Sequence, residues 1–342
     1  MKTSDFDYPL PSELIAQVPL DNRQCSRLMQ VSRVHNKIEH LQFYDIGKVL
    51  RTGDVLVLND SRVIPARLMG RRASGGTIEI LLLHRSAGDA WETLVKPARK
   101  AREGDLLEIA TTNGRPLKGE VVGMGEGGIR FIRFCDEASL ETAGQVPLPP
   151  YIHTPLINPE RYQTVYAREK GSVAAPTAGL HFTPQLLQSL QENGVEIVFV
   201  TLHIGLDTFR PVRVEDPHEH DLHKEYGEVC QQTAYRINQA KADGRRIVCV
   251  GTTTVRLLEQ SALYGNESEV VKPFKDWASL FILPGFQFRV TDAMVTNFHL
   301  PRSTLLMLVS TFAGKQLISE AYRSAMDNGY RFYSFGDAML IT

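Results

Sequence analysis

The sequence has few cysteines, no long hydrophobic run and almost no net charge, and each scarcity excludes a class of protein. Its four cysteines include no C-x-x-C pair, which argues against a disulfide framework or a thiolate metal site and favours a reducing compartment. No apolar stretch approaches the roughly 20 residues that span a bilayer. The acidic, proline-bearing beginning MKTSDFDYPLPSEL is unlike a signal peptide. We therefore expect a cytoplasmic protein.

Two nucleotide-binding motifs are also missing. No G-x-x-x-x-G-K-[ST] sequence occurs, which argues against a P-loop kinase or ATPase. Gly123, Gly125 and Gly128 have the spacing of a dinucleotide-binding fingerprint, but a predicted strand follows them where the fingerprint needs a helix. We interpret these glycines as a hairpin turn.

The bulk composition is typical of a soluble globular enzyme. The 342 residues predict about two domains, and 43% hydrophobic residues suffice for a substantial core. The net charge of −1 gives no general attraction to nucleic acid. Any contact with RNA must therefore come from a local basic patch.

The pattern of elements changes twice along the chain. Residues 67–150 hold short strand-like runs between glycine and asparagine turns, which predicts a small antiparallel β-barrel. Residues 1–66 and 151–342 instead alternate apolar strands with helices, as in 195–204, 245–251 and 251–263. We predict a discontinuous α/β domain with a mostly parallel sheet, into which the barrel domain is inserted.

Basic residues cluster in the predicted barrel and at its entry, where they are candidates for contacts with RNA phosphates. A solvated protein surface is the alternative interpretation. The candidates are Arg62, Arg67, Arg71, Lys96, Arg99 and Lys100.

The loop 162–182, YQTVYAREKGSVAAPTAGLHF, is the most informative segment. Its glycines and small residues allow a backbone to approach a bound molecule closely. It ends in His181 and Phe182 at the start of a helix, so it is suited to hold something flat and polar. The alternative is a tight connection that contains a buried histidine.

Polar residues also lie at the ends of two predicted strands and before an apolar helix. Gly251 to Thr254 lie between a buried strand and a helix, where backbone N–H groups favour an anion or another electron-rich acceptor. His203 leads into Asp207, Thr208 and Phe209 at the end of another strand, and His299 precedes an apolar helix. Ligands bind at the carboxyl ends of strands in open α/β sheets. Simple capping of the helices and a buried histidine remain the alternatives.

A histidine-rich segment, HEHDLHKE, resembles a metal-binding cluster. It holds His218, His220, His223 and Glu225 but lacks the H-E-x-x-H spacing that places two imidazoles on one face of a helix. We expect no metal here, although His220 and His223 could share a helical face. Loop ordering or acid–base chemistry is the other interpretation.

Taken together, these blocks resemble the S-adenosylmethionine:tRNA ribosyltransferase-isomerases of the queuosine pathway. The resemblance covers nearly the whole chain, including DFDYPLPSELIAQVP, NDSRVIPARL, VAAPTAGLHF, VGTTTVRLLE, TNFHLPRSTLLML and YRFYSFGDAM. The chain departs from the family pattern at Asp207, Leu222 and Thr254, where glycine, methionine and serine are usual. Aspartate can adopt a left-handed backbone only at a cost, so close approach of a ligand at Asp207 is in question.

The resemblance implies an α/β domain with an inserted barrel, and it implies a reaction. The ribosyl group of S-adenosylmethionine, the cosubstrate, moves onto 7-aminomethyl-7-deazaguanine at the wobble position of a tRNA, which gives epoxyqueuosine and releases adenine and methionine. Such chemistry needs a base for the carbon next to the sulfonium and a proton donor for adenine, but no metal or recycled cofactor.

We therefore assign roles by motif position. Acid–base candidates are His181, His203, Glu225 and His299. Cosubstrate-binding candidates are Gly179, Phe182, Asp207, Thr208, Phe209, Gly251, Thr252, Thr253 and Thr254. Phe182 or Phe209 would stack on adenine, and carboxylates, carbonyls or aromatic faces would surround the sulfonium while lysine and arginine stay away.

Two other functions remain to be distinguished. A metal-dependent hydrolase would use the histidine cluster, and a non-catalytic RNA-binding protein would use only the barrel. We expect a monomer with no obligate protein partner.

Overall fold

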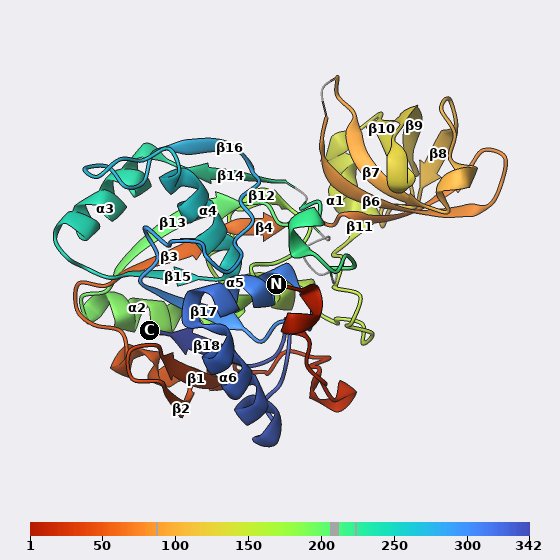
Figure 1. Cartoon of the computed structure of the whole chain (residues 1–342). Coiled ribbons are helices and arrows are strands. Elements are labelled where there is room, and N and C mark those ends of the chain that lie inside the picture. Colours follow the sequence, from red (N-terminus) through yellow and green to blue (C-terminus); the bar gives the residue numbers. More distant parts are fainter. Residues whose placement is uncertain (87, 206–211, 223) are drawn as a thin grey trace. The chain divides into compact units, whose positions relative to one another are not determined.

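The computed structural model describes residues 1–86, 88–205, 212–222 and 224–342 (Figure 1). The chain divides into two compact units. The larger comprises Met1–Arg62, Pro149–Glu169 and Ala175–Thr342, and the smaller comprises Val63–Leu148 and Lys170–Ala174. The smaller unit therefore includes residues 170–174, which lie outside the predicted barrel domain of residues 67–150.

The larger unit is built on a nine-stranded sheet with the order β16-β14-β13-β3-β15-β17-β18-β1-β2. The strands are β1 (Arg27–Ser32), β2 (Lys37–Gln42), β3 (Val55–Asn59), β13 (Glu196–Leu202), β14 (Glu225–Val229), β15 (Ile247–Val250), β16 (Phe274–Ala278), β17 (Ala293–Asn297) and β18 (Ala338–Ile341). The central strands β13, β3, β15 and β17 run parallel, and β1 runs parallel to β18.

The predicted α/β class is confirmed, but the sheet is mixed rather than mostly parallel. Pairings β16–β14, β14–β13, β17–β18 and β1–β2 are antiparallel. The parallel strands at the centre are apolar at nearly every position, because helices cover both faces there.

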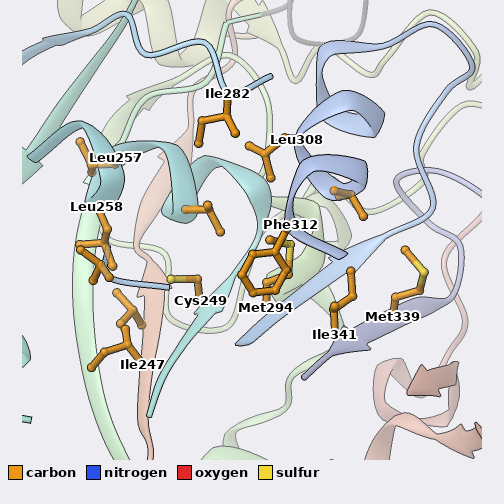
Figure 2. Close-up of a cluster of buried hydrophobic side chains, with 14 of the residues drawn as sticks. Ile247, Cys249, Leu257, Leu258, Ile282, Met294, Leu308, Phe312, Met339 and Ile341 are labelled. Carbon is orange, nitrogen blue, oxygen red and sulfur yellow. The ribbon is translucent and has the colours of Figure 1, made fainter. Parts of the chain in front are cut away.

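Alternating residues of the central strands supply two cores on opposite faces. The helices are α2 (Pro184–Glu192), α3 (Gln231–Ala242), α4 (Thr252–Ala262), α5 (Thr304–Ala313) and α6 (Lys315–Asp327). Val55 and Cys249 face α3 to α6, whereas Leu56 and Val248 face α2 and the 3-10 helix η4 (Phe43–Lys48). Figure 2 shows part of the first core, which draws on β15, β17 and β18 from the sheet and on α4 and α5 from the helices.

The smaller unit is an antiparallel barrel, as predicted. Its strands are β5 (Arg67–Arg72), β6 (Thr77–Arg85), β7 (Trp91–Lys96), β8 (Leu106–Ile109), β9 (Leu117–Met124) and β10 (Ile129–Phe134). They follow the order β5-β6-β7-β10-β9-β8, and pairing of β8 with β5 closes the ring. The glycines of 123–128 lie at the β9–β10 hairpin, which confirms the turn interpretation.

Short elements complete the described part of the chain. They are α1 (Leu140–Ala143), β11 (Gly144–Gln145), β4 (Ser61–Val63) and β12 (Glu169–Ser172). Strand β11 extends β5, and β4 and β12 form a separate two-stranded sheet. None of the helices described is both long and apolar enough to cross a membrane.

Candidate active site

A pocket of the larger unit lies at the carboxyl ends of three central strands. Ile204 follows β13, Gly251 follows β15, and Thr296 to Leu300 end and follow β17. Ala175 to Ala178 and the Tyr333–Ser334 pair line it as well. It encloses about 520 Å³ when the open solvent at its mouth is counted. Of the predicted strand ends, that of β15 lies at this pocket, and the residues predicted to follow β13 lie outside the described part of the chain.

The β15–α4 turn presents polar groups to this pocket. Gly251 has φ +91°, a conformation that favours glycine, and α4 begins without a side-chain cap. Thr252 and Thr253 line the pocket, and their hydroxyls form no hydrogen bond with a described residue. Uncapped N–H groups and the helix dipole make this turn electropositive.

Thr254 differs from its two neighbours. It is fully buried, and its Oγ1 donates a hydrogen bond of 2.7 Å to the carbonyl of Val250. It is not among the described residues that line the pocket. This hydrogen bond stabilises the first turn of α4, and a role of Thr254 in binding the cosubstrate stays a prediction.

Asn297 ends β17 and is held from two sides. Its Nδ2 donates to the carbonyl of Tyr333 at 3.0 Å and lies 3.3 Å from Nε2 of His181. The carbonyl can only accept, so the amide nitrogen must face it, and Nε2 must accept in turn. Asn297 Oδ1 is buried and accepts no hydrogen bond from a described residue.

His181 is a buried, neutral imidazole. Its Nδ1 lies 2.7 Å from Oγ of Ser26, and its ring stacks on Phe43 with centroids 4.9 Å apart. Burial lowers its pKa to about 3, further than the hydrogen bond from Asn297 raises it. With Nε2 accepting, Nδ1–H donates to Ser26. His181 thus contacts a pocket residue instead of lining this pocket itself.

His299 lines the pocket directly. Its Nε2 lies 2.7 Å from Oγ1 of Thr296, and burial lowers its pKa to about 3. Its backbone N–H donates to the Tyr322 hydroxyl at 2.8 Å. Among the described lining residues it is the one imidazole.

The other two acid–base candidates lie elsewhere. His203 is partly buried, with Nδ1 2.7 Å from Oγ of Ser61, and burial lowers its pKa. Glu225 is buried in an ion pair of 2.8 Å with Arg256 and also accepts from the backbone N–H of Gly205. Neither is among the described residues that line the pocket. The ion pair with Arg256 explains how the Glu225 carboxylate can be buried, which the local sequence did not indicate.

Two candidates of the 162–182 loop have packing roles. A Cβ on Gly179 would lie 2.0 Å from the Tyr166 hydroxyl, so only glycine fits there. Phe182 is fully buried and packs edge-on against Phe43 in the core beneath α2. The ring lies within the protein core, and its stacking on adenine stays a prediction.

Four predicted residues lie outside the described part of the chain. They are Asp207, Thr208, Phe209 and His223. In the part that is described, no three histidine, cysteine, aspartate or glutamate side chains are grouped so that they could hold a metal ion.

The sequence interpretation missed several lining residues. The rings of Tyr151 and Tyr333 are in tilted contact with centroids 4.7 Å apart, and the Tyr151 hydroxyl lies 2.6 Å from Oγ of Ser334. Asn297 stood in a motif we noted but was given no role. An amide at the end of a fully apolar strand is the signal that could have identified it.

The six basic candidates differ in their partners. Arg62 pairs with Glu160 at 2.5 Å, and Arg67 pairs with Glu79 at 3.1 Å. The other four are exposed in the barrel unit and form no ion pair with a described residue: Arg71, Lys96, Arg99 and Lys100.

Comparisons with known proteins agree over the full length. A family described as queuosine biosynthesis protein matches residues 3–341. The S-adenosylmethionine:tRNA ribosyltransferase-isomerase of Dehalococcoides mccartyi (strain CBDB1) is 52% identical, and that of Symbiobacterium thermophilum is 56% identical, each covering 100% of both chains. The crystal structure of an S-adenosylmethionine tRNA ribosyltransferase from Thermotoga maritima covers 99% of this chain and 100% of its own, with 40% identity and a TM-score of 0.58.

Proposed function

Since this chain belongs to the family of queuosine biosynthesis proteins, we infer that it is an S-adenosylmethionine:tRNA ribosyltransferase-isomerase. It moves the ribosyl group of S-adenosylmethionine to a 7-aminomethyl-7-deazaguanine base of tRNA, forms epoxyqueuosine, and releases adenine and methionine. Its substrates are S-adenosylmethionine and the precursor-bearing tRNA.

One observation carries the placement of the cosubstrate in the strand-end pocket. None of the described lining residues is lysine, arginine, aspartate or glutamate, and two tyrosines in contact, Tyr151 and Tyr333, form part of the wall. A sulfonium is a fixed cation that is repelled by lysine and arginine and attracted to aromatic faces. The lining therefore suits the charge of the cosubstrate.

We place the carboxylate of the cosubstrate at the first turn of α4. Unpaired N–H groups and a positive dipole end attract an anion, and the hydroxyls of Thr252 and Thr253 can donate to it. Gly251 keeps this turn open, because its positive φ directs the chain into the helix without a side chain.

We place the adenine near Asn297. Its buried Oδ1 has acceptor capacity that no described residue uses, and a buried acceptor without a donor costs free energy. The exocyclic amino group of adenine is such a donor. His181 fixes this orientation by accepting from Nδ2, so we propose that it positions Asn297 and does not exchange protons.

His299 remains the acid–base candidate in the pocket. Burial keeps it neutral at physiological pH, and neutral imidazole is the form that accepts a proton. The same burial lowers its pKa and so limits its strength as a base. His203 and Glu225 are secondary candidates, because their described contacts tie them to Ser61 and Arg256.

Adenine release is the test of the function. The purified protein is incubated with S-adenosylmethionine and tRNA that carries the 7-aminomethyl-7-deazaguanine base, and free adenine and methionine are quantified. We expect one of each per modified tRNA. Formation of S-adenosylhomocysteine without adenine would instead indicate methyl transfer and refute the proposal.

A further inference from the structure

A second recess adjoins the strand-end pocket in the larger unit. The two share Ser334, and Asn297 of the main pocket contacts His181 of the second recess. Arg23 and Arg161 line this recess from the 3-10 helices η3 (Arg23–Cys25) and η8 (Pro159–Tyr162). The main pocket has no charged side chain among its described lining residues, so the recess has the opposite character.

Both arginines keep unused hydrogen-bond donors. Arg23 donates to the carbonyls of Gln163 at 2.6 Å and Glu160 at 3.1 Å, and Arg161 donates to the carbonyls of Asp21 at 3.0 Å and Leu20. A guanidinium has five N–H donors, so about three remain on each. Neither arginine forms an ion pair with a described carboxylate. The main-chain bonds fix the planes of both groups and leave their charges unneutralised.

A third arginine adds positive charge near His181. Arg331 donates to the carbonyl of Val18, and its Nη1 is buried without a hydrogen-bond partner in the described chain. Burial lowers the pKa of Arg23, and the charge of Arg161 lowers it further. Both Arg23 and Arg331 also lower the pKa of His181. Arg23 and Arg161 repel each other beside the recess, and an anion bound there would stabilise both.

The nearby carboxylates form no ion pair with these arginines, although Glu160 raises the pKa of Arg23 and Asp337 raises that of Arg331. The side chain of Glu160 is exposed and pairs with Arg62 at 2.5 Å. Asp337 is buried, and its oxygens accept from the backbone N–H groups of Arg27 and Arg331 at 2.8 Å. The arginine recess, defined by its lining residues Arg23 and Arg161, therefore has donors and charge available to a ligand.

We propose that the arginine recess binds a backbone phosphate of the substrate RNA, next to the nucleotide whose base enters the main pocket. The inference rests on the proposed function. A base extruded into a protein pocket needs its flanking phosphates held in place, and guanidinium groups match phosphate oxygens in charge and planar geometry. The cosubstrate is a poorer occupant, because its sulfonium is repelled by arginine and its carboxylate has the α4 turn.

The test compares Arg161→Gln with Arg323→Gln, using the full chain and precursor-bearing tRNA. Arg323 is exposed on α6 and forms no ion pair with a described residue, so its variant is a matched loss of one charge. The dissociation constant of tRNA is measured across a salt series, and that of S-adenosylmethionine in parallel. For Arg161→Gln we expect roughly tenfold or greater weakening of tRNA binding. Its log–log salt slope should be smaller by roughly 0.7 per lost phosphate contact.

A second variant keeps the test decisive where Arg161→Gln fails to fold. Arg161→Lys retains the charge but loses the planar fork, so it should keep the salt slope and still bind tRNA several-fold more weakly. Circular dichroism and thermal unfolding verify the fold of each variant.

Three outcomes overturn the inference. In the first, the Arg161 variants bind tRNA as tightly as Arg323→Gln does. In the second, they weaken S-adenosylmethionine binding and leave the tRNA salt slope unchanged, which would assign the recess to the cosubstrate. Failure of the wild-type protein to release adenine removes the proposed function itself, and the inference falls with it. If the wild-type protein releases adenine normally and either of the first two results is found, the inference about the recess is wrong but the proposed function stands.

Discussion

Two buried histidines show how single residues near the site are tuned by their surroundings. His181 and His299 are both kept neutral by burial, which lowers their pKa values to about 3. His181 uses its two nitrogens in opposite ways, since Nδ1–H donates to Ser26 and Nε2 accepts from Asn297. A charged imidazole could not accept from that amide, so neutrality and orientation depend on each other.

The first prediction concerns the pH dependence of stability. Unfolding returns each histidine to a pKa of about 6.5, so between pH 3 and 6.5 the unfolded chain binds more protons than the folded one. The free energy of unfolding therefore falls as the pH drops below 6.5. We expect each histidine to account for about 2 kcal/mol of loss at pH 5.

Urea unfolding of wild-type protein, His181→Asn and His35→Asn at pH 7 and pH 5 measures this effect. His35 is exposed, so its variant should lose as much stability as wild-type protein does on acidification. His181→Asn should lose about 2 kcal/mol less. Equal losses in all three proteins would contradict the assignment.

The second prediction concerns Asn297 and the purine it reads. An analogue of S-adenosylmethionine that lacks the 6-amino group should bind wild-type protein several-fold to tenfold more weakly, because Oδ1 is left buried without a donor. Asn297→Ala removes this acceptor and should bind the two compounds about equally. Calorimetric titration of both compounds against both proteins completes the cycle. Undiminished discrimination in the variant would place adenine elsewhere.

At the scale of elements, the first turn of α4 assigns different tasks to consecutive threonines. Thr253 presents a hydroxyl at the pocket, whereas Thr254 turns its hydroxyl back to the carbonyl of Val250. The helical step of about 100° per residue separates their directions. Position in the turn therefore decides which hydroxyl can meet a ligand.

The third prediction uses this difference. Thr253→Val should weaken binding of S-adenosylmethionine roughly two- to tenfold, the usual value of one hydrogen bond, with little change in stability. Thr254→Val should lower stability and leave S-adenosylmethionine binding nearly unchanged, because the Thr254 hydroxyl donates to the carbonyl of Val250. Ligand titration and thermal unfolding of the two variants check both halves. Loss of affinity in Thr254→Val alone would invert the assignment.

Sequence patterns predicted the helices and strands near the site better than the tertiary contacts of their side chains. The strand-then-Gly-Thr pattern correctly indicated that Gly251 to Thr253 lie at a strand end beside a pocket. Nothing local to Phe182 distinguishes a ring that packs on Phe43 from one that stacks on a ligand. The ion pair of Glu225 with Arg256 was also hidden, since it joins residues 31 positions apart. Burial and pairing are tertiary properties.

At the scale of the whole molecule, strand composition predicted an α/β unit and an antiparallel barrel but not the complete order of the sheet. The parallel centre follows from continuous apolar strands alternating with helices. The antiparallel strands β14 and β16 and the position of β18 depend on contacts far along the chain, as between Leu28 and Ala338. Periodicity has a range of a few residues and cannot specify such partners.

The fourth prediction concerns the charge of the barrel unit. Arg71, Lys96 and Arg99 are exposed and form no ion pair with a described residue, so we propose that they contribute phosphate contacts. Reversing all three to glutamate should weaken tRNA binding and lower its salt slope, while S-adenosylmethionine affinity stays unchanged. The matched control reverses Lys118, Arg115 and Arg133, which are exposed on the same unit. A slope equal to that of the control would indicate a merely solvated patch.

The place of β18 has a consequence for how the protein is made. This strand, residues 338–341, lies between β17 and β1 and pairs with both, so among the described strands it alone joins the β1–β2 hairpin to the rest of the sheet (Figure 1). On a ribosome, residues 27–42 emerge early and must wait about 300 residues of translation for their neighbour. The barrel can close long before that, so the two units are expected to mature at different moments of synthesis.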